Sequence, residues 1–212
     1  MNLSRTLLAH PRWYAGFHRV LSQGKLEHLE RAVSSLELDG QTTHLVLDLG
    51  CGPGTSASVF SKPGWEYRGI DLEPAYVAHA RLAFPGRFEV GDVTRLEDLG
   101  QRFDLVLLNS VLHHLDDQGA EATLANAAVH LRPSGSLLLM DMVTPEGFGP
   151  GPALRRTLVR LDRGGHCRTA ATLEEMIGRH FGVMNAQAFA LSLGPVDLWE
   201  MRLYVCRRPT AR

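Results

Sequence analysis

The sequence predicts an α/β fold, a mainly parallel sheet with helices on both faces. Between residues 44 and 143, five short apolar runs alternate with segments of helical periodicity. Continuous apolar strands separated by helices are typical of a parallel sheet that is buried on both sides. Two further apolar runs near the end of the chain are separated by SLGPVD and predict an antiparallel pair at the sheet edge. A length of 212 residues suits one domain.

The predicted strands are short, and most of them end at glycine or at a polar side chain. The parallel strands are HLVLDLG, YRGIDL, RFEVGDV, FDLVLLNSVL and GSLLLMDMV, at residues 44–50, 67–72, 87–93, 103–112 and 135–143. The antiparallel pair is VMNAQAFAL and LWEMRLYVCR, at residues 183–191 and 198–207. The carboxyl ends of the parallel strands share one edge, where open α/β sheets bind ligands.

Helical periodicity fills the intervals between the strands. Residues 16–38 predict one helix, or two separated at Gly24. Helices are also expected at 74–83, 118–131, 153–162 and 172–181. Proline opens the first of these, and Thr172 with Glu175 predicts a capping box in the last. The glycine- and proline-rich residues 144–152 are expected to form a loop.

Composition excludes several classes of protein. Hydrophobic residues make up 44% of the chain and charged residues 21%, as in an ordinary globular protein. No apolar run approaches the roughly 18 residues of a membrane span, and the first residues do not resemble a signal peptide. Three cysteines without CxxC spacing indicate neither a disulfide framework nor structural zinc. We therefore expect a cytoplasmic protein with no metal site.

Charge is distributed unevenly along the chain. The net charge is −1, but residues 151–212 hold ten arginines against five acidic residues. This basic segment favours an anionic substrate or, alternatively, a solvated surface of arginine salt bridges.

The stretch HLVLDLGCGPGTS, residues 44–56, suggests where a ligand would bind. An apolar strand reaches the carboxylate of Asp48, and three glycines follow on alternate positions, Gly50, Gly52 and Gly54. A phosphate-binding loop of the GxxxxGK[ST] type is excluded, because no lysine lies between Lys25 and Lys62. A dinucleotide fold prefers GxGxxG, whereas Thr55 stands here at the third glycine position.

Acidic residues at the ends of the next two strands favour an adenosyl ligand. Asp71 lies 21 residues beyond Gly50, where a carboxylate can accept both hydroxyls of a ribose. Asp92 ends the third strand and can accept an adenine amino group, while the Val93 amide serves a ring nitrogen. NSVLHHLDD, residues 109–117, follows at the fourth strand end.

Taken together, these motifs resemble the class I S-adenosylmethionine-dependent methyltransferases. The matching stretches, within residues 44–143, are LDLGCGPGT, GIDLEP, GDV, FDLVLLNSVLHHLDD and LRPSGSLLLMD. The resemblance implies a Rossmann-like seven-stranded sheet of order 3-2-1-4-5-7-6 with strand 7 antiparallel. Residues 1–40 would form a helical lid segment and 41–212 the methyltransferase domain. The flanks resemble small bacterial methyltransferases of the domain-11 and domain-12 groups, which share the short helix after the glycine loop.

The resemblance also implies roles for individual residues in binding S-adenosylmethionine and its product, S-adenosylhomocysteine. The glycine loop lets the backbone approach the methionine part, Asp48 meets its ammonium, and Tyr14 reaches its carboxylate when the lid closes. Asp71 holds the ribose, although Asp48 and Asp71 could instead be ordinary capping residues. The remaining residues of the implied site are Cys51, through its backbone, Leu72, Asp92, Val93, Asn109, Ser110 and His114.

Methyl transfer from a sulfonium is an in-line displacement that needs positioning above all. A protonated oxygen or nitrogen acceptor also needs a base, and the candidate catalytic residues are His113, His114 and His166. Arg163, His166 and Arg168 could bind the carboxylate or phosphate of an anionic acceptor. Alternatively, Asp162 and Arg163 pair with each other or with the sheet edge.

Other classes of protein remain as rivals. An NAD(P)-dependent oxidoreductase is disfavoured by the glycine spacing and by the lack of a Tyr-xxx-Lys pair. A non-catalytic adenosylmethionine-binding protein stays open. A nucleic-acid methyltransferase is disfavoured because NSVL stands where the Asn/Asp-Pro-Pro-Tyr/Phe tetrad would lie, and no basic arm is visible. We expect a small-molecule acceptor, no nucleic-acid or membrane partner, and a monomer or homodimer.

Overall fold

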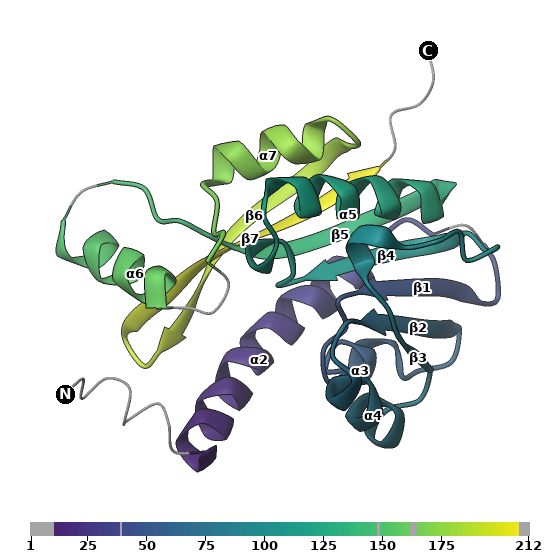
Figure 1. Ribbon diagram of the computed structural model, residues 1–212, viewed down its shortest axis with the longest axis horizontal. Coiled ribbons are helices and arrows are strands. Elements are labelled where there is room, and N and C mark those ends of the chain that lie inside the picture. The colour runs from purple at the N-terminus through teal and green to yellow at the C-terminus, as the bar shows by residue number, and fades with distance from the viewer. Residues whose placement is uncertain (1–10, 39, 148, 162–164, 208–212) are drawn as a thin grey trace.

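The computed structural model describes residues 11–38, 40–147, 149–161 and 165–207. For residues 11–22 and 161 it describes the backbone alone. Seven strands form one sheet in the order β3-β2-β1-β4-β5-β7-β6 (Figure 1). Strands β1 to β5 pair in parallel, and β7 runs antiparallel to both of its neighbours. The predicted fold class and strand order are confirmed.

Each strand lies close to its predicted position. The strands are β1 (His44–Leu49), β2 (Trp65–Asp71), β3 (Arg87–Val90), β4 (Phe103–Asn109), β5 (Leu131–Val143), β6 (Gly182–Leu193) and β7 (Val196–Arg207). The helices are α2 (Pro11–Ser34), α3 (Ala57–Phe60), α4 (Pro74–Ala83), α5 (Asp117–His130), α6 (Pro150–Leu161) and α7 (Ala170–Gly178), with 3-10 turns η1 (Val93–Arg95) and η2 (Leu112–His114).

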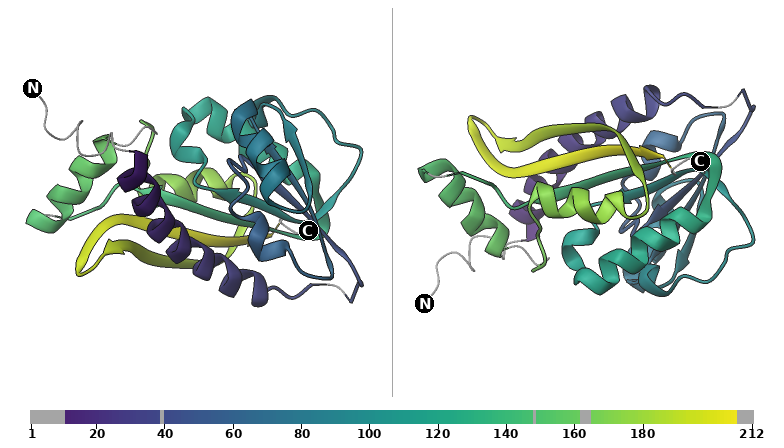
Figure 2. Two further views of the ribbon diagram at one scale, coloured as in Figure 1. Left: turned by 90° about the horizontal axis from the view of Figure 1, so that it is seen from below. Right: turned by 90° about the horizontal axis from the view of Figure 1, so that it is seen from above.

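Helices cover both faces of the sheet, as Figures 1 and 2 show. The core on one face joins β-strand side chains to α2, α3 and α4, and that on the other joins them to α5 and α7. Neighbouring residues of a strand serve opposite faces: Val46 belongs to the first core and Leu47 to the second, both fully buried. Burial of each such side chain contributes about 1.5–3 kcal/mol.

Helix α2 continues through Gly24, so the single helix is the correct one of the two predicted alternatives. Two local predictions need correction. The predicted capping box at Thr172 and Glu175 is wrong, because the N-cap lies at Thr169, whose Oγ1 accepts the Thr172 N–H at 3.2 Å. The extended backbone of Thr169 starts the helix two residues earlier than predicted. Strand β5 begins at Leu131 rather than at residue 135, with an irregularity in its pairing with β4.

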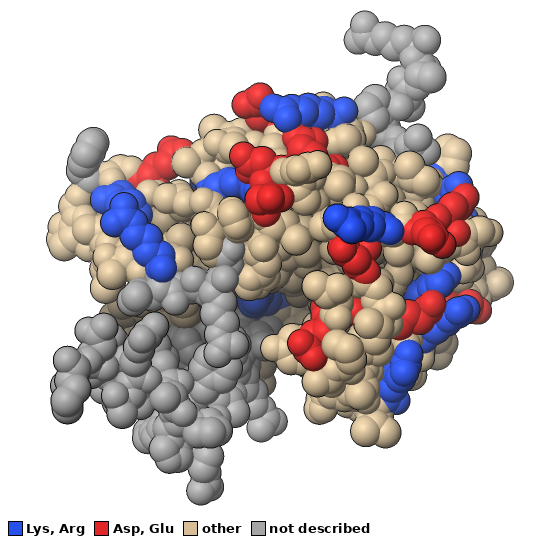
Figure 3. Space-filling model, viewed as in Figure 1, with Lys and Arg blue, Asp and Glu red and all other residues tan. Residues whose placement is uncertain are grey.

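Charges of both signs are interspersed on the face seen in Figure 3, over α5 and α7 and around the β2–β3 side of the sheet. The ion pairs of the structure include Arg179 with Glu175 at 2.8 Å and Arg102 with Asp98 at 2.7 Å. Among the described residues, no helix combines the length and the apolarity that crossing a membrane requires.

Candidate functional site

The glycine loop connects β1 to the short helix α3 at the carboxyl edge of the sheet. All three glycines have positive φ, +80° at Gly50, +54° at Gly52 and +86° at Gly54. A Cβ at Gly50 would lie 2.5 Å from a methyl carbon of Val111, so this position requires glycine. Gly52 has open space where its Cβ would be. The loop therefore leaves room for a ligand at Gly52.

Asp48 lies at the base of this loop and is fully buried. The Tyr67 hydroxyl donates a hydrogen bond to its Oδ2, while its Oδ1 has no hydrogen-bond partner among the described residues. Burial raises the pKa of Asp48 to about 7, and the bond from Tyr67 opposes that rise. A buried carboxylate oxygen without a donor is costly. A cationic group delivered to Oδ1 would relieve this cost.

Asp71 braces the glycine loop from the end of β2. Its Oδ2 accepts the Gly52 N–H at 2.7 Å, and its Oδ1 accepts the Glu73 N–H at 2.9 Å. Asp71 therefore does act as a capping residue for backbone N–H groups, the alternative role considered from the sequence. It does not exclude ribose binding, because an ionised carboxylate offers about four lone-pair sites. The neighbouring Leu72 is 69% exposed.

Asp92 caps the turn η1 after β3. Its Oδ1 accepts the Thr94 N–H at 2.9 Å and the Thr94 hydroxyl at 2.7 Å. These two bonds lower the pKa of Asp92 and keep it ionised. The Val93 side chain is buried, and its carbonyl accepts the Asn126 amide at 2.8 Å. The turn is thus rigid, and Asp92 sits half-buried at the same edge as Asp71.

The end of β4 carries a polar chain that spacing in the sequence does not reveal. Asn109 donates from Nδ2 to Ser56 Oγ at 3.1 Å, and Ser110 donates from Oγ to Asn109 Oδ1 at 3.3 Å. Lys25 of α2 donates from Nζ to Ser110 Oγ at 3.0 Å. Ser56, Lys25 and Tyr67 were not predicted as site residues. Lys25 and Ser110 lie 85 positions apart, so only the fold brings them together.

The two adjacent histidines after β4 have different surroundings. His113 is buried, and its Nδ1 pairs with Asp141 Oδ1. Asp141 also accepts the N–H groups of Leu112 and Met142, each at 2.7 Å. Burial opposes the ionisation of Asp141, but His113 and these N–H groups lower its pKa overall. His114 is exposed, with its ring centroid 4.0 Å from that of His113.

The segment after α6 is tied to the loop after β4. Arg168 donates to Asp117 Oδ1 at 2.8 and 2.9 Å and to the carbonyls of Leu112 and Leu115 at 2.8 and 2.9 Å. Its guanidinium therefore holds two loops together, which favours a positioning role over acceptor binding. The exposed His166 donates its N–H to the carbonyl of His113 at 3.1 Å, so it belongs to the same junction.

Three residues with predicted roles cannot be placed in this way. Arg163 and its neighbour Asp162 fall outside the described residues, and so does the side chain of Tyr14. Their roles stay predictions.

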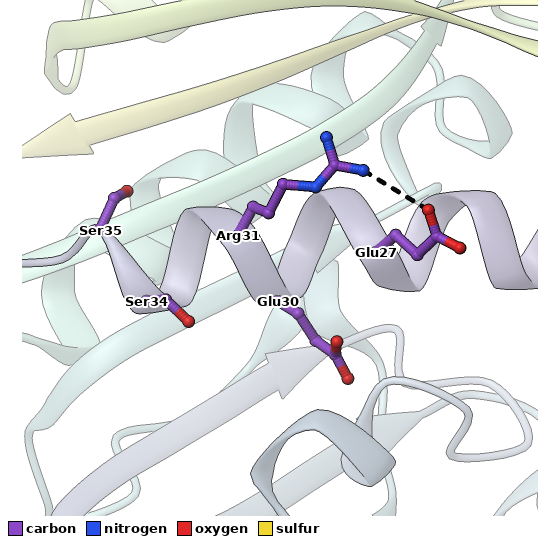
Figure 4. A pocket seen from close by; sticks show the side chains of 5 residues that line it. All are labelled: Glu27, Glu30, Arg31, Ser34 and Ser35. Atoms are coloured by element: carbon purple, nitrogen blue, oxygen red, sulfur yellow. Dashed lines mark hydrogen bonds and ion pairs between the residues drawn. The ribbon is translucent and has the colours of Figure 1, made fainter.

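A hollow of about 500 Å³ lies elsewhere, on the C-terminal half of α2 (Figure 4). Only α2 and the residue after it line the hollow, and its one ion pair joins Arg31 to Glu27 at 3.4 Å. The lining residues are Glu27, Glu30, Arg31, Ser34 and Ser35. None of these belongs to the loops at the carboxyl edge, so we do not assign the hollow to the functional site.

The strand order, the glycine loop after β1 and the acids after β2 and β3 define a class I methyltransferase architecture. Residues 46–135 match a family described as a methyltransferase domain. Over these residues the comparison confirms the predicted resemblance to the class I S-adenosylmethionine-dependent methyltransferases.

Similar proteins extend this finding. Trans-aconitate 2-methyltransferase of Escherichia coli (strain K12 / DH10B) is 32% identical over 111 residues, 51% of this chain and 41% of that protein. A dTDP-3-amino-3,4,6-trideoxy-alpha-D-glucopyranose N,N-dimethyltransferase of Streptomyces venezuelae is 30% identical over 109 residues, 50% and 46% of the two chains. The chain matches about half the length of such relatives or less.

Solved structures share the fold. Magnesium protoporphyrin IX methyltransferase from Synechocystis PCC 6803, solved with bound S-adenosylhomocysteine, superposes with a TM-score of 0.68. The match covers 98% of this chain and 88% of that one, at 20% sequence identity. An identity this low makes the likeness one of architecture alone.

Proposed function

We propose that this protein transfers a methyl group from S-adenosylmethionine to an oxygen or nitrogen atom of a small-molecule acceptor. The observation that carries the proposal is Asp48: its buried Oδ1 receives no hydrogen bond from the described residues, and Asp48 lies beside the glycine loop, which is open at Gly52. The amino-acid part of the cofactor brings an ammonium that fits this oxygen. The named relatives given above support a small-molecule acceptor, since their names describe one acid and one amino sugar.

The described residues fit the rest of the cofactor as well. Gly52 leaves room for the methionine part, and Asp71 retains lone pairs for the ribose hydroxyls. The exposed Leu72 side chain would cover one face of the adenine, and the half-buried Asp92 would accept its amino group. When bound, S-adenosylmethionine supplies an electrophilic methyl group on a sulfonium.

The reaction places modest demands on the protein. The leaving group is a neutral thioether, so no general acid is required. Asn109 and Ser110 at the end of β4 would border the transferring methyl group and hold the acceptor in line with it, and orientation can contribute roughly 7–11 kcal/mol. We assign His114, exposed at this edge, as the candidate base for an acceptor that starts protonated. His113 would position His114 through their ring contact and the pair with Asp141.

A binding experiment with matched variants tests the cofactor assignment. Asp71→Asn should weaken S-adenosylhomocysteine binding by about 1.5–3 kcal/mol, the usual contribution of hydrogen bonds to a charged group. Asp98→Asn is the control, because Asp98 pairs with Arg102 in the segment that leads into β4 and is not one of the candidate site residues. Equal affinity of the wild type and Asp71→Asn would contradict the proposed ribose contact.

A further inference from the structure

Lys25 reaches the end of β4 from a helix that packing holds in place. Its Nζ donates to Ser110 Oγ at 3.0 Å, and the side chain is half-buried. One turn further along α2, Leu29 is fully buried in the core. The His28 ring stacks on Phe189 of β6 with centroids 3.8 Å apart. These contacts fix the helix, so they also fix where the ammonium group of Lys25 can reach.

The residue that Lys25 meets is itself held in a costly conformation. Ser110 has φ of +61°, and no other non-glycine among the described residues has positive φ. Such a backbone costs of order 1–3 kcal/mol and is found mainly at functional sites. The Ser110 N–H donates to the Met140 carbonyl at 2.7 Å, which anchors the turn. The fold thus maintains a strained turn whose hydroxyl faces the Lys25 ammonium.

Lys25 is also one end of a polar chain across the site. The hydrogen bonds run from Lys25 through Ser110 and Asn109 to Ser56. Ser56 follows the glycine loop that begins after Asp48. A cation therefore stands at one end of the chain, and the other end adjoins the loop that would hold the methionine part of the cofactor.

We propose that Lys25 is a carboxylate-binding residue of the methyl-transfer site, an inference that rests on the proposed function. The carboxylate can come from the amino-acid part of the cofactor or from the acceptor. An ammonium has three donors, so Lys25 can keep its bond to Ser110 while it contacts a carboxylate. Arg168, one of the residues predicted to bind the acceptor, donates to Asp117 and to backbone carbonyls.

The composition of the chain makes this inference directly measurable. The sequence contains two lysines, Lys25 and Lys62, and Lys62 is exposed in the turn after α3. Protein labelled with ¹³C-lysine therefore gives a reporter and an internal control in one NMR spectrum. The probes are S-adenosylhomocysteine, its decarboxylated analogue S-adenosyl-3-thiopropylamine, and citrate added to protein saturated with S-adenosylhomocysteine. We expect a carboxylate-bearing probe to shift the Lys25 Cε signal while that of Lys62 stays in place.

Variants distinguish the two sources of the carboxylate. If it belongs to the cofactor, Lys25→Gln should bind S-adenosylhomocysteine at least 10-fold more weakly and the decarboxylated analogue unchanged. If it belongs to the acceptor, Lys25→Gln should keep its affinity for S-adenosylhomocysteine and lose citrate binding. Lys25→Arg should retain most of the affinity in either case, and Lys62→Gln should match the wild type.

Two results would overturn the inference. One is a wild type that binds S-adenosylhomocysteine with no change in the Lys25 signal on adding any probe. The other is a Lys25→Gln protein that binds every probe as the wild type does. In both cases the proposed function survives, because cofactor binding is intact. A wild type that binds none of the probes would remove the proposed function and this inference together.

Discussion

Replacing Asp48 by asparagine should stabilise the ligand-free protein at alkaline pH. In the folded state burial raises the pKa of Asp48 from 3.8 to about 7. A group whose pKa is raised on folding favours the folded state only while it is protonated, and this contribution is lost as pH rises toward 7. The shift is about 3 units, and each unit corresponds to 1.36 kcal/mol. Above pH 7, ionised Asp48 therefore costs the fold up to about 4 kcal/mol, which asparagine avoids.

Urea unfolding at pH 5 and at pH 8.5 measures this effect. We expect Asp48→Asn to be more stable than the wild type at pH 8.5, and the advantage should shrink as the pH falls below 7. Tyr67→Phe is a useful comparison, because it removes the hydrogen bond from the Tyr67 hydroxyl to Oδ2 and should destabilise the ionised state further. An Asp48→Asn protein that is less stable than the wild type at pH 8.5 would refute the reasoning.

The same substitution should weaken binding of S-adenosylhomocysteine. Loss of a charge-assisted hydrogen bond from the ligand's ammonium is worth about 1.5–3 kcal/mol, or roughly 10- to 150-fold in affinity. Calorimetry at pH 8.5 gives this ratio directly. Asp48→Asn should therefore raise the stability of the ligand-free protein and lower its affinity for S-adenosylhomocysteine. We expect these opposite effects if the Asp48 carboxylate binds the ligand. Equal affinity of the two proteins would contradict the role of Asp48.

Three further predictions concern the same edge of the sheet. The affinity of the wild type for S-adenosylhomocysteine should fall about tenfold per pH unit below pH 7, as Asp48 is protonated, and calorimetry across pH 5.5–8.5 should follow this slope. Gly50→Ala should cost about 1–3 kcal/mol in urea unfolding, whereas Gly178→Ala, with open space around it, should be neutral or stabilising. Burial raises the pKa of Cys51, so a thiol reagent at pH 8 should leave it unmodified in the folded protein, as peptide mapping would show.

Much of the fold could be predicted because each strand carries its own local signal. Apolar runs and the residues that end them located the seven strands, and Pro74 located the start of α4. The errors lie at the boundaries of elements. The sequence left open whether Gly24 breaks the first helix, and the structure has one helix in which the following Leu29 is fully buried. The cap of α7 moved to Thr169, another residue able to accept the same backbone N–H.

The sequence could predict a candidate site residue only where that residue lies at the end of a strand. Asp48, Asp71 and Asp92 follow from their places after β1, β2 and β3, although their contacts with a ligand stay predictions. Lys25 and Tyr67 could not be found in this way. Each meets its partner through the fold, Lys25 at Ser110 and Tyr67 at Asp48, and no spacing in the sequence encodes those contacts.

Calorimetric titration of the purified protein with S-adenosylhomocysteine, with NAD as the comparison, tests the central claim most directly. The geometry around Asp48 and Asp71 predicts binding of S-adenosylhomocysteine in the micromolar range and none of NAD. Binding of NAD alone would contradict the account and direct attention to hydride transfer. Binding of neither ligand would contradict the assignment of the glycine loop as a cofactor site.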